Sequence, residues 1–185
     1  MQKWCLACLS IIVAACHQHT YEVKGTAEGF DDGDVLVVEN GLESAFVADT
    51  ILVRDGVFSY EGRADSALFM VIRSLKYTDV EASFIAEPGI TAQVSISSDG
   101  IIVVGGTKAN EAWQELTEVC NAYSRQVEQL AETFYQEDVG QEQLEDLSLR
   151  VGRLKEQMGF WLEDFGKRNA DNAAGKFLQR EAVWK

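Results

Sequence analysis

Cysteine and histidine are the side chains best suited to covalent or metal chemistry, and most of them lie near the N-terminus of this chain. Cys5 and Cys8 have the spacing of a redox motif, but they lie in an apolar segment with no strand before them, so redox chemistry is not expected there. His17 and His19 supply two of the three or four ligands that a zinc site needs. No histidine follows residue 19, which excludes a Ser-His-Asp or Cys-His arrangement in the remaining chain. The pair is therefore interpreted as part of a polar tether.

Cys16 is the residue with the most specific context. It follows Val13-Ala14-Ala15 at the end of an apolar stretch, Trp4 to Ala15, that begins after Lys3. This order is typical of a secretory signal peptide, and the stretch is too short to cross a bilayer. Val13-Ala14-Ala15-Cys16 resembles a bacterial lipobox, which implies that the cysteine sulfur is lipidated and that cleavage leaves Cys16 as the first residue.

The lipobox implies a protein that is tethered to a membrane and folded outside the cytoplasm. His17 stands where an aspartate commonly retains lipoproteins at the inner membrane. We therefore expect a lipid-anchored protein of the cell envelope, at the outer membrane and facing the periplasm.

Three further motifs contain residue types that could take part in chemistry. Cys120 lies on an apolar helical stripe, where burial would raise the pKa of its thiol, so a packed core cysteine is expected rather than a reactive one. Asp31-Asp32-Gly33-Asp34 lacks the closing glutamate of a calcium loop and is interpreted as a solvated turn. Gly105-Gly106 is not followed by the Lys-Ser/Thr of a phosphate loop. The sequence thus predicts no catalytic residue, no metal site and no cofactor.

The charge balance limits the partners. The 185 residues include 16 basic and 30 acidic side chains, for a net charge of −14. Lys3 is the only charged residue among residues 1–15, so the mature part would carry 15 basic and 30 acidic residues, or −15. Such a field disfavours nucleic-acid backbones and anionic membrane surfaces. The expected partners are the membrane, through the lipid, and a protein of the envelope.

Residues 21–106 are predicted to form β structure. Turn signals separate short runs rich in valine, isoleucine and phenylalanine, and Asx-Gly pairs supply the positive φ angles that tight hairpins require. Such close spacing favours an antiparallel sandwich or open barrel. The turn pairs are Asp32-Gly33, Asn40-Gly41, Asp55-Gly56, Pro88-Gly89 and Asp99-Gly100.

Beyond Gly106 the apolar period changes to steps of three and four. Thr107 is the expected N-cap, and a break near Val139-Gly140 divides two stripes. This predicts an antiparallel helical hairpin over residues 107–170 with a buried seam. A third short helix within 171–185 would open at Asp171 or Asn172. The seam residues are Trp113, Leu116, Cys120, Tyr123, Val127, Leu130 and Phe134, then Leu144, Leu147, Val151, Leu154, Met158, Trp161 and Phe165. No obvious partner is expected for Phe177, Leu178, Val183 and Trp184.

Three segments carry a family resemblance: Tyr21 to Asp34, Asp55 to Gly62, and Gly105 to Asn110. Together they resemble DUF4369. In that family a β-rich module commonly lies at the N-terminus of lipoproteins, and a glutamate-rich helical stretch joins it to a thioredoxin-like domain. The likeness runs from Tyr21 to the end of the helical hairpin. No Cys-x-x-Cys follows Cys16, so the resemblance assigns no redox residue here.

The predicted fold class is α+β: an antiparallel β-sandwich-like domain followed by an antiparallel helical hairpin. The expected divisions are a signal peptide (1–15), a tether (16–20), the β domain (21–106), the hairpin (107–170) and a C-terminal helical segment (171–185).

The expected function is that of a non-catalytic binding or spacer module associated with periplasmic thiol-disulfide exchange. One alternative is the N-terminal part of a thioredoxin-like oxidoreductase. A ligand-binding cavity in the β domain and an oligomeric scaffold paired through the hairpin are two others.

Overall fold

The structure is a computed structural model that describes residues 19–41, 49–134 and 140–181. The lipobox with Cys16, and also His17, Val183 and Trp184, lie outside the described residues. The chain divides into two compact units, one up to Trp113 and one from Gln114 onward. Each unit is described by itself.

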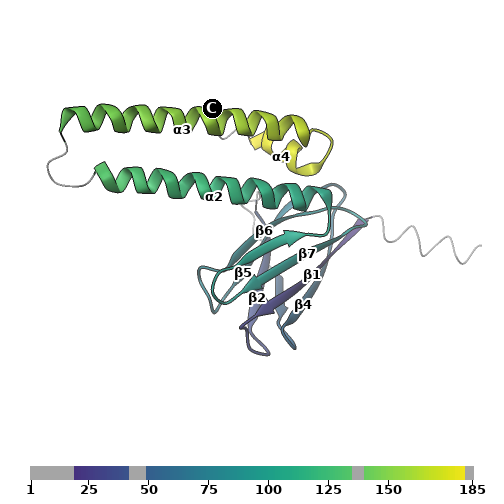
Figure 1. The fold of residues 1–185 in the computed structure, drawn as a ribbon. Coiled ribbons are helices and arrows are strands. Elements are labelled where there is room, and N and C mark those ends of the chain that lie inside the picture. The colour runs from purple at the N-terminus through teal and green to yellow at the C-terminus, as the bar shows by residue number, and fades with distance from the viewer. Residues whose placement is uncertain (1–18, 42–48, 135–139, 182–185) are drawn as a thin grey trace, which may run out of the picture. The chain divides into compact units, whose positions relative to one another are not determined.

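The first unit contains two four-stranded sheets that face each other (Figure 1). One sheet has the strand order β4-β1-β7-β8 and the other the order β3-β2-β5-β6. The strands are β1 (Thr20–Glu28), β2 (Val35–Asn40), β3 (Asp49–Leu52), β4 (Val57–Arg63), β5 (Leu68–Ser74), β6 (Glu81–Ala86), β7 (Thr91–Ser97) and β8 (Ile102–Gly105). The predicted sandwich-like domain is confirmed.

One strand pair departs from the antiparallel pattern. β1 and β7 run parallel, with Glu22 opposite Thr91 and Glu28 opposite Ser97, whereas every other pair of neighbouring strands is antiparallel. Parallel neighbours cannot be joined by a hairpin. The whole of β2 to β6 is therefore the crossover that brings these two central strands together.

The core lies between the sheets and follows the two-residue period of the strands. On β1, Tyr21, Val23 and Ala27 are buried, while Glu22 and Lys24 point outward. Burying one such apolar side chain contributes about 1.5–3 kcal/mol. The largest fully buried side chains of this unit are Phe84, Leu36, Ile72, Ile85, Ile96, Val23, Val38, Val53, Val94 and Asn110.

Four of the five predicted turn pairs place their glycine at positive φ. These glycines are Gly33, Gly56, Gly89 and Gly100, at 90°, 70°, 76° and 87°. The fifth pair, Asn40-Gly41, has another role. The amide of Gly41 donates to the carbonyl of Phe69, and a Cβ on Gly41 would lie 2.5 Å from Cδ1 of the Phe69 ring. Gly41 is needed there because the ring approaches the backbone closely.

The helix α2 (Lys108–Phe134) begins where the sequence predicts. The hydroxyl of Thr107 accepts the N–H of Asn110 at 3.0 Å, which confirms the N-cap. The indole of Trp113 packs edge-on against Phe69, with 5.1 Å between ring centroids, and donates to the hydroxyl of Ser83 at 3.0 Å. These contacts join the first turns of α2 to the sandwich, beyond the predicted limit at Gly106.

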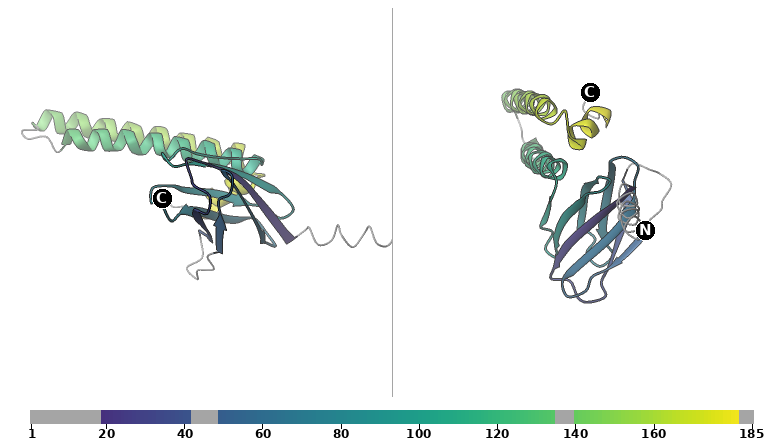
Figure 2. Two further views of the ribbon diagram at one scale, coloured as in Figure 1. Left: turned by 90° about the horizontal axis from the view of Figure 1, so that it is seen from below. Right: turned by 90° about the vertical axis from the view of Figure 1, so that its right-hand side faces the viewer.

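The second unit is the predicted antiparallel helical hairpin. It comprises α2 from Gln114, α3 (Gln141–Arg168) and α4 (Ala173–Glu181), and α2 and α3 run side by side in every view (Figure 2). The guanidinium of Arg168 joins the two long helices, since it donates to Glu115 on α2 at 3.0 Å and to Asp164 on α3 at 2.7 Å.

The hairpin seam is buried over only part of its length. Leu116, Met158 and Phe165 are buried, but Leu144 is 38% exposed and the other described seam residues are half-buried. The buried residues lie toward the Arg168–Glu115 pair. The expectation of a seam buried along its whole length is therefore wrong for the part of the hairpin that lies away from the Arg168–Glu115 pair.

Of the two predicted N-caps for the last helix, Asn172 is the one used. Its Oδ1 accepts the N–H of Gly175 at 3.1 Å. α4 packs against α3. Phe177, for which the sequence offered no obvious partner, is buried there, and Leu178 is half-buried.

Candidate functional site

His19 is the described member of the predicted His-x-His pair. Its Nδ1 lies 2.8 Å from Oδ1 of Asp65, and both side chains are largely exposed. The main-chain carbonyl of His19 accepts the N–H of Ala64. His19 is therefore fixed to the two residues that follow β4, and β1 begins at the next residue, Thr20, which was predicted as part of the tether.

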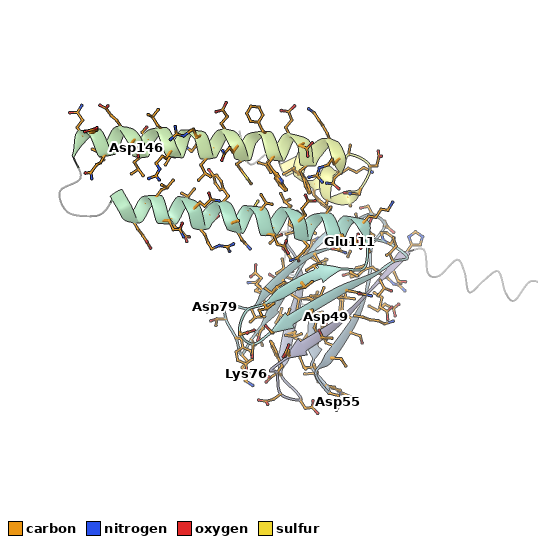
Figure 3. All side chains as sticks on the ribbon, viewed as in Figure 1. Asp49, Asp55, Lys76, Asp79, Glu111 and Asp146 are labelled. Atoms are coloured by element: carbon orange, nitrogen blue, oxygen red, sulfur yellow. The ribbon has the colours of Figure 1, made fainter. Side chains whose placement is uncertain are left out.

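The acidic turn Asp31-Asp32-Gly33-Asp34 is held by a lysine. The ammonium of Lys76, labelled in Figure 3, lies 2.6 Å from Oδ2 of Asp31 and 2.9 Å from Oδ2 of Asp34. Hydrogen bonds from Lys76 and from the amide of Asp31 lower the pKa of Asp34, and the two carboxylates raise that of Lys76. An ammonium thus occupies the position at which two of these carboxylates converge.

Neighbouring contacts fix the same end of the sandwich. The hydroxyl of Tyr77 donates to the carbonyl of Gly29 at 3.1 Å, and its ring packs edge-on against Phe30. Asp32 accepts the amide of Asp55 at 2.7 Å. Three loops, those that follow β1, β3 and β5, are therefore tied together here. Within residues 19–41, 49–134 and 140–181, no group of three or more His, Cys, Asp or Glu side chains could hold a metal ion.

Cys120 is a free thiol on α2 and is half-buried rather than fully packed. Partial burial raises the pKa of the thiol, in the direction expected from the sequence. A raised pKa lowers the thiolate fraction at neutral pH, and the thiolate is the reactive form. The geometry supports a structural role for this cysteine.

Asn110 was missed by the sequence reasoning. It is fully buried, its Oδ1 accepts the N–H of Ile85 at 2.7 Å, and its Nδ2 donates to the carbonyl of Ile85 at 2.9 Å. Ile85 lies on β6, the edge strand of its sheet. The side chain thus pairs with the strand as a neighbouring backbone would. An asparagine in a first helical turn carries no sequence signal for this role.

A shallow groove of about 360 Å³ lies on the outer face of the β4-β1-β7-β8 sheet. The register of β1 and β7 places these side chains together, since Lys24 lies opposite Gln93, and Thr26 opposite Ser95. The hydroxyls of Thr26 and Ser95 are 2.5 Å apart and satisfy each other. No aromatic side chain lines this groove. Its lining combines polar side chains with Val94, Val103 and two glycines.

A larger groove, of about 710 Å³, opens between the edge strands β3 and β4, and we name it the β3–β4 groove. Its floor is apolar because Ile51 and Phe58 are buried there, and Phe58 lies directly over Gly25, its partner in β1. The full lining is Lys24, Gly25, Thr50, Ile51, Leu52, Arg54, Val57, Phe58, Ser59 and Tyr60. A volume of this size is typical of ligand-binding clefts.

Tyr60, at one end of the β3–β4 groove, contacts a second tyrosine. Its ring centroid lies 6.1 Å from that of Tyr21, whose hydroxyl is 3.8 Å from the sulfur of Met70. Burial is the largest cause of the raised pKa of both phenols, and the carboxylate of Asp49 adds to it. Both hydroxyls therefore stay protonated well above neutral pH and serve as hydrogen-bonding groups.

The described helices contain none that is long and apolar enough to span a membrane. No curated protein matches this chain, and no solved structure does. The model of one family, DUF4369, a domain of unknown function, matches residues 21–113. The match covers half of the 185 residues, and it includes the described strands from Tyr21 of β1 to β8 and the first turns of α2 up to Trp113. The chain belongs to the DUF4369 family.

Proposed function

We propose that this protein is a lipid-anchored, non-catalytic binding module of the bacterial cell envelope. The anchor is Cys16, and the binding part is the β sandwich. The proposed location is the outer membrane with the sandwich facing the periplasm, since His17 replaces the aspartate associated with inner-membrane retention.

The observation that carries the proposal is the position of Cys16 relative to β1. The strand begins at Thr20, four residues after Cys16, and is hydrogen-bonded on both sides, to β4 and to β7. Four extended residues span at most about 14 Å. A lipid on Cys16 would thus hold the end of the sandwich that contains His19 close to the bilayer, with a central strand as the point of attachment.

The candidate groups for chemistry support a non-catalytic role. The Cys120 thiol has a raised pKa, the His19 imidazole pairs with Asp65 at the surface, and two carboxylates of the acidic turn are held by Lys76. Catalysis by a nucleophile or base needs a group with a pKa near the working pH and a partner that activates it. Cys120 lacks that combination, Lys76 occupies the acidic turn, and the His19–Asp65 pair is largely exposed and lines neither groove.

The test is membrane fractionation of cells that produce the full chain with Cys16→Ser. The variant should move from the membrane to the soluble fraction, because the sulfur that would be lipidated is gone. Cys8→Ser is the matched control, since it removes a thiol from the leader and leaves the lipobox intact, and it should stay with the membrane. Equal membrane association of the Cys16→Ser variant would contradict the proposed anchor.

A second candidate function rests on the family resemblance. In DUF4369 lipoproteins a glutamate-rich helical stretch precedes a thioredoxin-like domain, and here α2 and α3 follow the matched residues. The module would then accompany or present a thiol-disulfide enzyme. Coding sequence beyond Lys185 with a Cys-x-x-Cys motif would favour this candidate over a module acting alone.

A further inference from the structure

We propose that the β3–β4 groove is an acceptor site for an extended, acidic peptide segment of a partner protein, which adds as a strand between β3 and β4. This inference rests on the proposed binding role of the sandwich and names the kind of partner. It does not depend on the lipid anchor.

The ladder between β3 and β4 is limited to one residue pair beside the turn. The two strands are joined by a tight turn, and Arg54 and Val57 exchange two main-chain hydrogen bonds, of 2.9 and 3.0 Å. In the described part of the chain no further pair follows, because β3 continues into one sheet and β4 into the other. The hairpin therefore opens into the groove.

Main-chain N–H and C=O groups on β3 point toward the groove. Val53 donates its N–H to the carbonyl of Asp34, on the β2 side. The direction of the main-chain N–H and C=O groups alternates along a strand, so those of Leu52 and Thr50 point away from β2. They point to the open edge. The N–H of Thr50 donates a hydrogen bond to the carboxylate of its neighbour Asp49 at 2.7 Å. The carbonyl of an incoming strand could replace this carboxylate as the acceptor.

The same alternation applies to β4. The carbonyl of Gly56 accepts the N–H of Ala27, so the main-chain groups of every second residue after it, Phe58 and Tyr60, point toward β1. The main-chain groups of Ser59 and Glu61 therefore point to the other side, where the groove lies. Two rows of main-chain donors and acceptors thus flank one gap. A peptide strand satisfies such rows with its own backbone, which is the mode of binding called β-strand addition.

The side chains that line the groove are apolar at its floor and basic at two positions. A strand placed there would direct alternate side chains inward, onto Ile51 and Phe58, and outward, toward solvent. Among the described residues that line the groove, the charged ones are Lys24 and Arg54, whereas the chain as a whole has a net charge of −14. Lys24 also pairs with Glu22 at 3.0 Å, while Arg54 is exposed. Alternating apolar and acidic side chains are complementary to this lining.

The test uses the full chain and a fluorescent nine-residue peptide of alternating valine and glutamate. Binding is measured by fluorescence anisotropy, and hydrogen exchange of the Leu52 and Ser59 amides is measured with and without peptide. Arg54→Glu removes a groove cation, and Arg63→Glu, at the last residue of β4 and outside the groove lining, is the matched control. A peptide N-methylated at every second residue keeps its side chains but loses one row of donors.

The proposal predicts saturable binding that is weakened at least tenfold by Arg54→Glu and by N-methylation but is unchanged in Arg63→Glu. The Leu52 and Ser59 amides should exchange more slowly in the complex. Equal binding of the N-methylated peptide would overturn strand addition. The absence of peptide binding at millimolar concentration would also overturn it. The same holds if laurate binds and the peptide does not, because laurate has a charge and an apolar chain but no peptide groups. None of these results would alter the fractionation of the Cys16→Ser variant, so the two proposals fail separately.

Discussion

The side-chain amide of Asn110 pairs with both main-chain groups of Ile85, at 2.7 and 2.9 Å, and so completes the edge of β6 from the first turn of α2. Unprotected edges invite pairing with other chains. This one is satisfied by a side chain that is itself fully buried. The helix start and the sandwich are therefore one structural unit.

Replacement of Asn110 by alanine should lower the free energy of unfolding by about 2–4 kcal/mol. Two buried main-chain groups would lose their partner, at about 1–3 kcal/mol each, offset in part by the better helix propensity of alanine. Urea denaturation measures the change. Asn121→Ala, at an exposed position of the same helix, should stay within about 0.5 kcal/mol. Equal stability of both variants would contradict the role assigned to Asn110.

Gly25 should tolerate no larger residue while Phe58 is present. A Cβ on Gly25 would lie 2.0 Å from Cζ of the Phe58 ring, which is buried. Gly25→Ala should therefore cost about 1–3 kcal/mol of stability, as overpacking does. Gly105→Ala, where a Cβ meets nothing within 4 Å, is the control and should be nearly neutral. In the double variant Gly25→Ala/Phe58→Leu the costs should be less than additive, because the clash is relieved.

The Asp34–Lys76 pair should make stability depend on acid pH. The folded protein lowers the pKa of Asp34 below its ordinary value of 3.8, so the pair stabilises above that pH and its contribution is lost as the pH falls through the folded-state pKa. Asp34→Asn should lower the melting temperature at neutral pH, and its difference from the unchanged protein should shrink toward about pH 2. Asp79→Asn, at an exposed position in the loop after Lys76, is the control and should leave the melting temperature at neutral pH nearly unchanged.

Cys120 should react slowly with thiol reagents in the folded protein. Partial burial raises its pKa above the ordinary 9.0, so the rate of labelling should rise with pH later than that of a free thiol and should increase sharply in urea. Cys120→Ala should cost about 1–2 kcal/mol, less than a fully buried side chain of similar size would. Rapid labelling at neutral pH would contradict a structural cysteine.

Much of the fold could be predicted from local chemistry. The Asx-Gly and Pro-Gly turns, the Thr107 cap and the stripes of α2 and α3 depend on neighbouring residues, and all of them are present in the structure, apart from Asn40-Gly41. That pair matches a turn signal in composition. Its glycine is required by the ring of Phe69, 28 residues further along the chain, which no local pattern reports.

The remaining features depend on contacts between distant residues. The parallel pairing of β1 with β7 joins residues 69 positions apart, such as Glu22 and Thr91, and alternation alone does not select a partner strand. The β3–β4 groove exists because two strands of one hairpin enter different sheets. The half-buried state of Cys120 reflects how far the two helices pack along their length. The apolar periodicity predicts which face of the helix carries Cys120, but it does not predict how deeply that side chain is buried.

The measurement that tests the anchored module most directly is the intact mass of the native protein extracted from its own membranes. A mass equal to residues Cys16–Lys185 plus lipid is the predicted result. A mass that retains Met1 and carries no lipid would contradict the anchor. A substantially larger mass would contradict a module acting alone and would make the thiol-disulfide enzyme the leading candidate.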